Sequence, residues 1–361
     1  MPERSAAVDA HPAAEGGAAV AAALRILQSF PTPRPTTNPY LVMLAQALRA
    51  EPDLEVLNFS WKTALLGRYD VFHVHWPEIM VTGGTLPKRT VRQALFLLLL
   101  ARLRLTRTPI VRTLHNIGLP DGLNRVERVL LKLFERRTAL VITLNTLTPV
   151  PPTVPSATIL HGHYRDWYGK YPQSGAVPGR FGYTGLIRRY KGVEALAAAF
   201  LDTAGLEPGL SLLIGGSPSS DGLTEGLREL GGRDGRMVLD LRFLPDADFV
   251  TAISSSELVV FPYVFMHNSG GVLAALSLGR PALVPDNEVN RQLAAEVGPG
   301  WIHFFTGAPT AEVLLEALRA VRAAGLPEAP DLSARNWDHA AADHRAAYRR
   351  AVDSLGGRPA R

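Results

Sequence analysis

The chain has 361 residues, of which 47% are hydrophobic and 20% charged, and this indicates a globular protein too long for one ordinary core. It contains no cysteine, which excludes disulfides, thiolate chemistry and cysteine-ligated metals. The formal charge of +5 suits phosphorylated ligands or an anionic membrane face. No aromatic-rich basic stripe of the kind that binds single-stranded nucleic acid is present, so we expect no nucleic-acid partner.

The N-terminal stretch 1–20 is rich in Ala, Gly and Pro and contains Glu3 and Asp9. It has neither the basic start nor the unbroken apolar segment of a signal peptide, so we expect a disordered leader. The longest dense apolar run, 94–101, is too short to span a bilayer. These features predict a cytoplasmic protein.

From residue 21 the chain alternates between apolar strands and amphipathic helices. The first predicted strand, 21–30, ends at a Pro-rich turn, and a helix follows from Asn38 to about residue 50. Further elements of this half are a charged helix at 123–138 and strands at 54–59, 69–74, 109–114, 139–144 and 158–160. The alternation predicts a parallel sheet with helices on both faces, in which ligands bind outside the carboxyl ends of the strands.

The strand 69–74 leads into a loop with imidazole, indole and carboxylate side chains. Strand alternation turns His73 into the sheet, and we expect His75, Trp76 and Glu78 to be exposed. A metal site would need a third ligand, which is not evident here. The alternative to a chemical role is that the histidine only caps its strand by hydrogen bonding.

Two later strands of this half also end in polar loops. The residues concerned are His115, Asn116 and Asp121 after the first of them, and His163 and Tyr164 after the second. Because the carboxyl ends of parallel strands share one edge of the sheet, these loops are candidates for ligand binding as well.

The apolar run 94–101 is bracketed by arginines from Arg89 to Arg107. One interpretation is a helix that beds into an anionic membrane surface, which would give a peripheral membrane contact through 89–107. The other is a buried helix whose arginines extend to solvent. The sequence leaves both interpretations open.

The segment 173–180 has no hydrophobic periodicity and is the predicted linker between two domains. Beyond it the alternation resumes, with strands at 181–186, 210–214, 237–242, 258–262 and 281–284, and helices at 193–204, 221–230, 246–254 and 270–278. Helical patterns at 311–324 and 337–355 follow near the C-terminus.

A basic turn follows the first strand of this second half. It carries Arg188 and Lys191 to the start of a helix, which Gly192 opens. Cations beside the free amides of a helix N-terminus make a good anion site. A tight loop at Gly216, after the next strand, faces the same edge of the sheet. The alternative is an ordinary solvated turn.

A second such turn is His267-Asn268-Ser269-Gly270-Gly271. Its glycines let backbone amides approach a ligand closely, and its serine offers a hydroxyl at the N-terminus of the next helix. Two anion-ready turns in one α/β domain, one of them supplying Arg and Lys, predict a diphosphate ligand.

These motifs resemble the GT-B glycosyltransferases, and in particular a bacterial branch that includes the β-mannosyltransferases of xanthan-type polysaccharide assembly. The resemblance covers roughly 22–305 and rests on 72–78, 113–116, 161–164 and 187–192, and on the Gly-rich helix start that leads to Gly279 and Pro281.

The resemblance implies two Rossmann-like domains that face each other across a cleft. The first, 21–172, would bind the acceptor, and the second, 181–335, would bind the nucleotide sugar. The C-terminal helix and tail, 336–361, would pack back toward the first domain.

The resemblance also implies a role for each turn of the second domain. Arg188 and Lys191 would neutralise the donor diphosphate. Backbone and hydroxyl donors to the same ligand would come from Gly192, Gly216, His267, Asn268, Ser269, Gly270 and Gly271. Because fixed cations and a helix end do the work of a metal, we expect no metal and no other cofactor.

One departure from the family concerns mechanism. Retaining members carry two glutamates that would fall near Met266 and Ala274, and neither position is acidic here. The departure favours inversion, in which a base deprotonates the acceptor hydroxyl. The candidate bases are Glu78, His75 and Asp121. The predicted acceptor or sugar ligands are Trp76, His115, Asn116, His163 and Tyr164.

We therefore predict a glycosyltransferase that moves a hexose from a nucleotide diphosphate sugar to a glycan, glycolipid or polyprenyl-linked acceptor, the last at the inner face of the membrane. The resemblance makes GDP-mannose the first choice of donor and UDP-glucose the second. A soluble natural-product acceptor is one alternative, and a nucleotide-sugar epimerase or a phosphoglycan-binding module on the same scaffold is another. A dehydrogenase is disfavoured because no G-x-G-x-x-G follows a strand.

Overall fold

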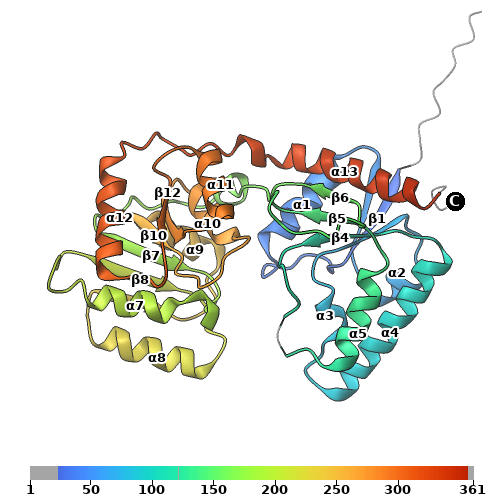
Figure 1. The fold of residues 1–361 in the computed structure, drawn as a ribbon, viewed down its shortest axis with the longest axis horizontal. Coiled ribbons are helices and arrows are strands. Elements are labelled where there is room, and N and C mark those ends of the chain that lie inside the picture. Colours follow the sequence, from blue (N-terminus) through green and yellow to red (C-terminus); the bar gives the residue numbers. More distant parts are fainter. Residues whose placement is uncertain (1–22, 121, 357–361) are drawn as a thin grey trace, which may run out of the picture.

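The computed structural model describes residues 23–120 and 122–356, so the predicted leader and Asp121 lie outside it. Two parallel six-stranded sheets, each covered by helices, form two lobes that lie side by side (Figure 1). The predicted α/β architecture of two Rossmann-like domains is confirmed.

The first sheet has the strand order β2-β1-β3-β4-β5-β6. Its strands are Leu24–Gln28 (β1), Leu54–Leu57 (β2), Val71–Val74 (β3), Ile110–Leu114 (β4), Thr138–Thr143 (β5) and Ser156–Thr158 (β6). The helices between them are Pro39–Ala50 (α1), Trp61–Leu66 (α2), Glu78–Val81 (α3), Leu86–Leu105 (α4) and Arg125–Glu135 (α5). The order reverses between β1 and β3, and a crevice for ligands is expected at the carboxyl ends of these two strands.

The second sheet has the order β12-β11-β10-β7-β8-β9. Its strands are Arg180–Thr184 (β7), Ser211–Gly215 (β8), Met237–Asp240 (β9), Leu258–Val260 (β10), Ala282–Pro285 (β11) and Ile302–Phe305 (β12). Its helices are Val193–Leu201 (α7), Asp221–Gly232 (α8), Asp246–Ser254 (α9), Gly270–Ser277 (α10), Glu288–Val297 (α11) and Ala311–Ala323 (α12). The order reverses between β7 and β10, and both predicted anion turns follow these two strands.

Side chains at the helix starts explain several boundaries. Asn38 accepts a hydrogen bond from the Tyr40 amide at 3.0 Å, and Pro39 occupies the first position of α1. Asn124 and Glu127 form a reciprocal capping box at α5. The hydrophobic pattern did not predict α2, α3, α11 or β12. Of these, α3 and β12 have only four residues each, too few for a clear periodicity.

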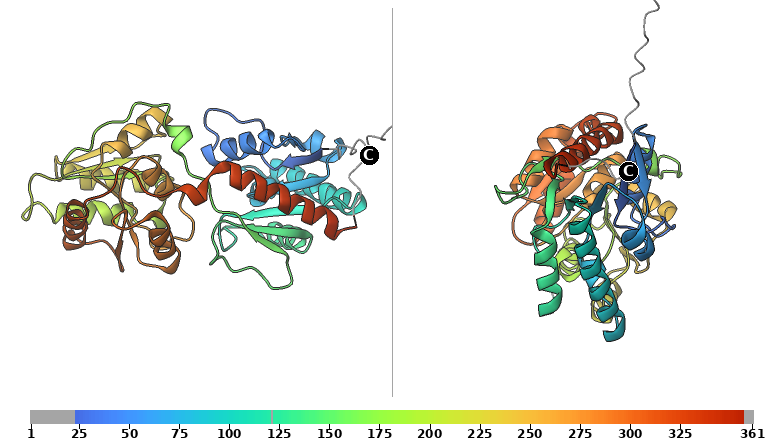
Figure 2. Two further views of the ribbon diagram at one scale, coloured as in Figure 1. Left: turned by 90° about the horizontal axis from the view of Figure 1, so that it is seen from above. Right: turned by 90° about the vertical axis from the view of Figure 1, so that its right-hand side faces the viewer.

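The chain returns to the first domain at its end. Helix Trp337–Ser354 (α13) lies along α1 and contacts β3, β4 and β5, as the views from two directions show (Figures 1 and 2). Its Tyr348 is fully buried in the core that it shares with the first sheet. The expected packing of the C-terminal helix on the first domain is therefore present.

The two segments that cross between the domains bind each other. Trp337 donates to the carbonyl oxygen of His163 at 2.7 Å, and its indole lies against Gly162, where no Cβ would fit. The guanidinium of Arg335 donates to the carbonyl oxygen of His161 and pairs with Glu296 at 2.6 Å. The crossings thus form one seam at a single edge of the interface.

A short helix after the first crossing, Arg165–Tyr168 (α6), falls in the range predicted for the first domain. Its contacts are with the second: Trp167 and Tyr171 both donate to Asp246, at 3.0 and 3.1 Å, and Tyr168 stacks on Phe249. The described chain therefore leaves the first domain before α6.

The apolar run 94–101 lies in α4. A small core with α2, α3 and α5 buries one face of this helix, which consists of Phe96, Leu99 and Leu100 from the run and Leu103 just after it. The opposite face of α4 is exposed. Within residues 23–120 and 122–356, no helix combines the length and apolarity needed to cross a membrane.

Candidate active site

A cavity of about 560 Å³ opens between the strand-end loops of the two domains. The first domain contributes the loop 115–120 that follows β4. The second contributes Tyr190 and Lys191 from the basic turn, and Tyr263 with 265–271 from the loop after β10. The two turns predicted to bind a diphosphate therefore meet on one side of a single cavity.

The start of α10 presents hydrogen-bond donors to this cavity. Ser269 caps the helix by accepting from the Val272 amide at 3.3 Å. The amides of Gly270 and Gly271 find no acceptor in the part of the chain that the structure describes. A Cβ at Gly271 would lie 2.8 Å from the ring of Phe261, so the helix can approach this close only without a side chain there. The arrangement suits an anion.

Lys191 places a positive charge at the same cavity. Its Nζ lies 5.0 Å from the ring centroid of Tyr263. Burial, and then the nearby charge of Arg188, lower the pKa of Lys191 to about 8, so the ammonium form still predominates at neutral pH. Among the described residues that line the cavity there is no carboxylate, and the local charge therefore favours an anionic ligand.

Three other predicted donor residues do not border this cavity. Arg188 is exposed outside it. Gly192 and Gly216 have φ values of 63° and 148°, and a Cβ at either would collide with a backbone carbonyl, of Pro262 and Gly185 respectively. Both glycines are required by the close approach of backbone segments.

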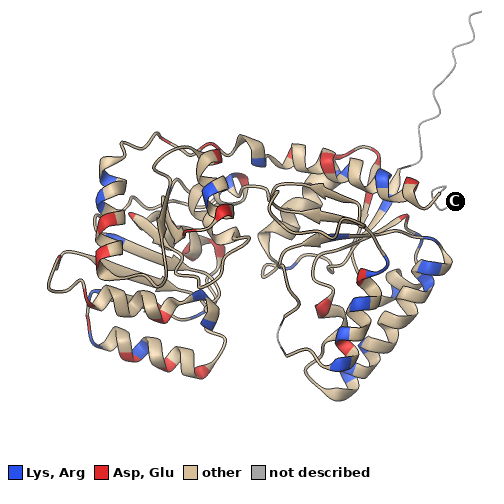
Figure 3. Ribbon diagram, in the orientation of Figure 1, with Lys and Arg blue, Asp and Glu red and all other residues tan. Residues whose placement is uncertain are grey.

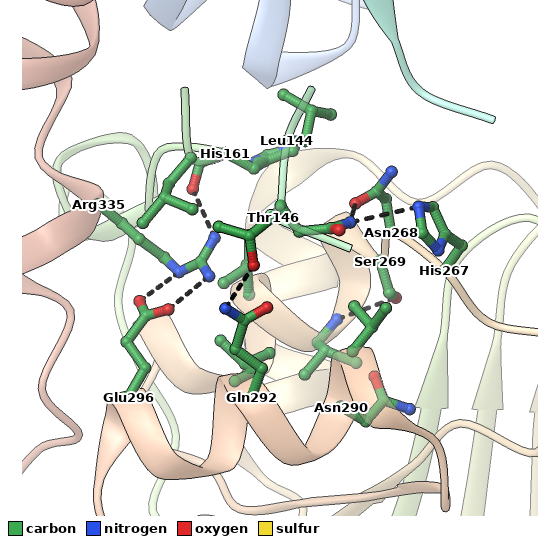
Figure 4. Close-up of a pocket in the computed structure, with 16 residues that line it drawn as sticks. Leu144, Thr146, His161, His267, Asn268, Ser269, Asn290, Gln292, Glu296 and Arg335 are labelled. Carbon is green, nitrogen blue, oxygen red and sulfur yellow. Dashed lines mark hydrogen bonds and ion pairs between the residues drawn. The ribbon is translucent and has the colours of Figure 1, made fainter. Parts of the chain in front are cut away.

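His267 and Asn268 bridge the two domains (Figure 4). Asn268 accepts from the side-chain amide of Asn145 at 2.8 Å and donates to the carbonyl oxygen of His115 at 3.2 Å. His267 Nε2 lies 2.7 Å from Thr148 Oγ1. These two residues therefore hold the loop before α10 against the ends of β4 and β5, beside a smaller cavity of about 160 Å³.

A buried histidine network lies behind the cavity in the first domain. His75 is only 2% exposed, contrary to the expected exposure. Its Nδ1 lies 3.1 Å from His115 Nε2, and its Nε2 lies 3.3 Å from Gln28 Oε1. Because both ring nitrogens are engaged, His75 cannot contact a ligand in the cavity directly.

The network continues to the C-terminal helix. Tyr348 of α13 lies 2.8 Å from His73 Nδ1 and accepts from Gln28 at 3.4 Å, while His73 Nε2 lies 2.8 Å from Thr113 Oγ1. Burial, followed by the neighbouring histidines, holds the pKa values of His73 and His75 well below the usual range, so both are neutral. The described residues contain no group of three His, Cys, Asp or Glu side chains that could hold a metal ion.

Trp76 and Glu78 also differ from their expected positions. The indole of Trp76 stacks on the ring of His115 at 4.2 Å, so this face is covered rather than available to a sugar. Glu78 begins α3, is partly buried and does not border the cavity; burial is the main cause that raises its pKa. Of the loops predicted at this sheet edge, the one with His115 and Asn116 lines the cavity.

Comparison with known proteins identifies the family. No protein-family model matches the chain. Over 340 residues the chain is 42% identical to the GDP-mannose:glycolipid 4-beta-D-mannosyltransferase of Xanthomonas campestris pv. campestris, a match that covers 94% of this chain and 95% of the relative. The chain belongs to the GT-B glycosyltransferases.

Solved structures agree on the fold of this glycosyltransferase. Anabaena Alr3699/HepE in complex with UDP-glucose superposes with a TM-score of 0.57 at 15% identity, covering 92% of this chain and 97% of that one. The catalytic domain of Arabidopsis thaliana Starch Synthase IV, bound to ADP and acarbose, gives 0.59 at 12% identity, covering 93% and 100%. Family membership sets aside the epimerase and binding-module alternatives for this chain.

His163 and Tyr164, predicted to bind the acceptor or sugar, do not line the cavity of this glycosyltransferase. The carbonyl oxygen of His163 accepts from Trp337 in the seam between the domains. Tyr164 is only 4% exposed and does not line the cavity. Its backbone amide donates to the hydroxyl of Ser277 in α10 at 2.9 Å. Both residues connect the crossing segment to its surroundings.

Several residues around this site were not predicted from the sequence. Tyr190, Tyr263 and Phe265 line the cavity, and Gln28 and Tyr348 complete the buried network. Tyr190 had a signal, because it stands inside the basic turn, and Gln28 is a lone amide in an apolar strand. Tyr348 had none, because its partners lie far away in the sequence.

Proposed function

We propose that this glycosyltransferase transfers mannose from GDP-mannose to a glycolipid acceptor with inversion of configuration and without a metal ion. The similar enzyme of Xanthomonas carries this donor and a glycolipid in its name. Its product is a β-mannoside, and because the mannosyl bond of GDP-mannose is α, forming a β bond requires inversion.

The observation that carries the proposal is the start of α10 beside Lys191. The free amides of Gly270 and Gly271, the Ser269 hydroxyl and one ammonium group face the same cavity between the domains. A diphosphate held there lies beside the loop 115–120 of the first domain, which lines the same cavity. The same groups stabilise the charge that develops on the leaving diphosphate, which is the work a metal ion does in other transferases.

We further propose that α4 and α5 dock on an anionic membrane surface. The exposed face of α4 is an apolar stripe at helical spacing, which consists of Pro87, Val91, Ala94, Leu98, Ala101 and Leu105. Leu98 is 57% exposed and Leu105 84%. A stripe of this kind on a helix that also carries cations is typical of helices that lie in a membrane interface.

Basic side chains are present on α4 itself and on the neighbouring α5. Figure 3 shows Lys and Arg gathered on α4 and α5. The exposed ones on α5 are Arg125, Arg128 and Lys132, and the exposed Arg136 follows its last residue. The two glutamates of α5 are paired internally, Glu127 with Arg89 and Glu135 with Arg112. The surface thus presents apolar and positive groups together, which complements anionic lipid head groups. The loop that lines the cavity runs directly into α5, so a lipid-linked acceptor would reach the site from this side.

Thermal shift against GDP, UDP, dTDP and ADP, first without metal and then with Mg²⁺, tests the donor. A diphosphate that binds the native state raises the melting temperature by mass action. We expect GDP alone to give a metal-independent shift. A shift with UDP and not with GDP would replace the donor, and a shift that requires Mg²⁺ would contradict the metal-free site.

Sedimentation with phosphatidylglycerol vesicles tests the membrane surface. We expect binding that weakens with added salt and that is lost in Leu98→Asp. The matched control is Leu206→Asp, which changes an exposed leucine of the second domain that is 55% exposed. Equal binding by the two variants, or binding to neutral vesicles alone, would contradict this docking surface.

A further inference from the structure

His115 connects the buried network of the first domain to the cavity. It lines the same cavity as Lys191, and its carbonyl oxygen accepts from Asn268 of the second domain at 3.2 Å. The stacked indole of Trp76 holds the ring in place from one face. The only hydrogen bond to its imidazole from the described residues is the one between Nε2 and His75 Nδ1, at 3.1 Å.

The partners of this network determine which nitrogens carry protons. The side-chain amide of Gln28 donates to Tyr348, so Gln28 Oε1 faces His75 as an acceptor. His75 therefore carries its proton on Nε2 and leaves Nδ1 unprotonated. That nitrogen in turn accepts the Nε2 proton of His115. The remaining nitrogen, His115 Nδ1, then holds a free lone pair.

The free nitrogen is accessible. No described residue forms a hydrogen bond with His115 Nδ1. Unlike His344 Nε2, this atom is not among the fully buried atoms that lack a hydrogen-bond partner. It therefore keeps some exposed surface, on a half-buried ring that borders the cavity. Burial, followed by the proximity of His75, His161 and Arg112, holds the pKa of His115 well below its usual value, so the basic form predominates at neutral pH.

We propose that His115 is the general base of the transfer, with His75 and Gln28 as positioning residues that fix its tautomer. The assignment rests on the proposed inverting transfer. His115 Nδ1 takes the proton of the acceptor hydroxyl as the acceptor oxygen bonds to the anomeric carbon. The bond from that carbon to the diphosphate breaks, and the diphosphate leaves with the electron pair, beside Lys191 and α10. The imidazolium is stabilised by its Nε2–H bond to His75 and later returns the proton to water.

The other candidates fit this role less well. Both nitrogens of His75 are engaged in the interior. Glu78 does not border the cavity. The role of the His75–Gln28 pair resembles that of the carboxylate in a catalytic triad, which orients a histidine without accepting its proton. Here a neutral amide replaces the carboxylate, so the base remains weakly basic and uncharged before reaction.

The test measures GDP binding, product configuration and turnover with GDP-mannose as donor and octyl β-glucoside or water as acceptor. We expect His115→Gln to keep its affinity for GDP within about twofold and to lose turnover by roughly 100-fold or more. The control is His303→Gln on the edge strand β12, which should retain both.

The positioning roles of His75 and Gln28 are tested by the pH dependence of kcat/KM, which a purely structural role would leave unchanged. We expect His75→Leu to shift the acid limb of the kcat/KM profile to lower pH, because the imidazolium of His115 loses its acceptor. Gln28→Glu should shift it to higher pH, because a carboxylate behind His75 stabilises that imidazolium. Unchanged limbs in variants that still bind GDP would overturn the positioning roles.

The outcomes separate the base from the proposed function. A product with retained configuration would overturn both the inversion and the base. An inverted product together with a His115→Gln enzyme that keeps turnover within tenfold would overturn the base alone. A loss confined to Asp121→Asn would assign the base to that carboxylate instead.

Discussion

The two domains build their halves of the site in different ways. The second domain uses backbone: a helix start, two glycines and one capping serine, all within a few residues of sequence. The first uses side chains from separate strands and from α13, connected by hydrogen bonds in the interior. An anion site made of backbone can be recognised in a short motif, whereas a side-chain network depends on which distant residues meet.

The largest expected contrast is in response to acid. His161 and His344 are buried in the first domain and its crossing, and burial lowers the pKa of each to about 4. The unfolded chain takes up these protons near pH 6.5, so it binds more protons than the native state between these values. The contribution of these histidines to the free energy of unfolding is therefore fully present above about pH 6.5 and is lost as the pH drops toward 4. At pH 5 the loss is about 2 kcal/mol per histidine.

Urea unfolding at pH 7.5 and pH 5 measures this effect. His344→Gln should remove about half of the pH-dependent change in unfolding free energy that these two histidines cause, since glutamine does not titrate in this range. Hydrogen exchange at pH 5 should show the first domain opening before the second. Equal unfolding free energies at the two pH values would contradict the prediction.

Lys191→Ala tests the second domain's half of the site. Loss of the charge-assisted contact should lower kcat/KM for the donor by roughly 100-fold, equivalent to about 2.7 kcal/mol. Stability should not fall, because a partly buried ammonium is removed. The control is Lys170→Ala, whose ammonium lies over Trp167 outside the cavity. Comparable losses in both variants would show that net charge, rather than position, matters.

Gly162→Ala tests the seam between the domains. A methyl group there would overlap the indole of Trp337, and relieving the overlap should cost about 2 kcal/mol of unfolding free energy. Chemical denaturation measures the loss. Gly175→Ala, where an added Cβ meets nothing, is the matched control and should be nearly neutral.

Tyr348→Phe has the smallest expected effect. It removes the hydroxyl between His73 and Gln28 while keeping the buried ring, so stability should fall by about 1 kcal/mol. Affinity for GDP should not change, because the second domain binds the nucleotide. A loss of GDP affinity in Tyr348→Phe would contradict this division of roles between the two domains.

The same contrast explains what could be predicted from the sequence. The alternation of strands and helices and the two anion turns follow from local patterns, whereas the return of the last helix is implied by the family resemblance. The burial of His75 could not be foreseen, because strand alternation does not say that α13 and Gln28 enclose that end of β3. For the same reason Trp76 was expected to be free, although it stacks on His115 from a neighbouring strand.

The position of α13 has a consequence for biosynthesis. Strands β1–β6 are complete by Thr158, but the helix that covers them begins only at Trp337. The whole second domain is therefore synthesised before α13, and until then one face of the first sheet lacks the helix that carries Tyr348. During synthesis the second domain can therefore fold first, and the first domain completes its core only after α13 has left the ribosome.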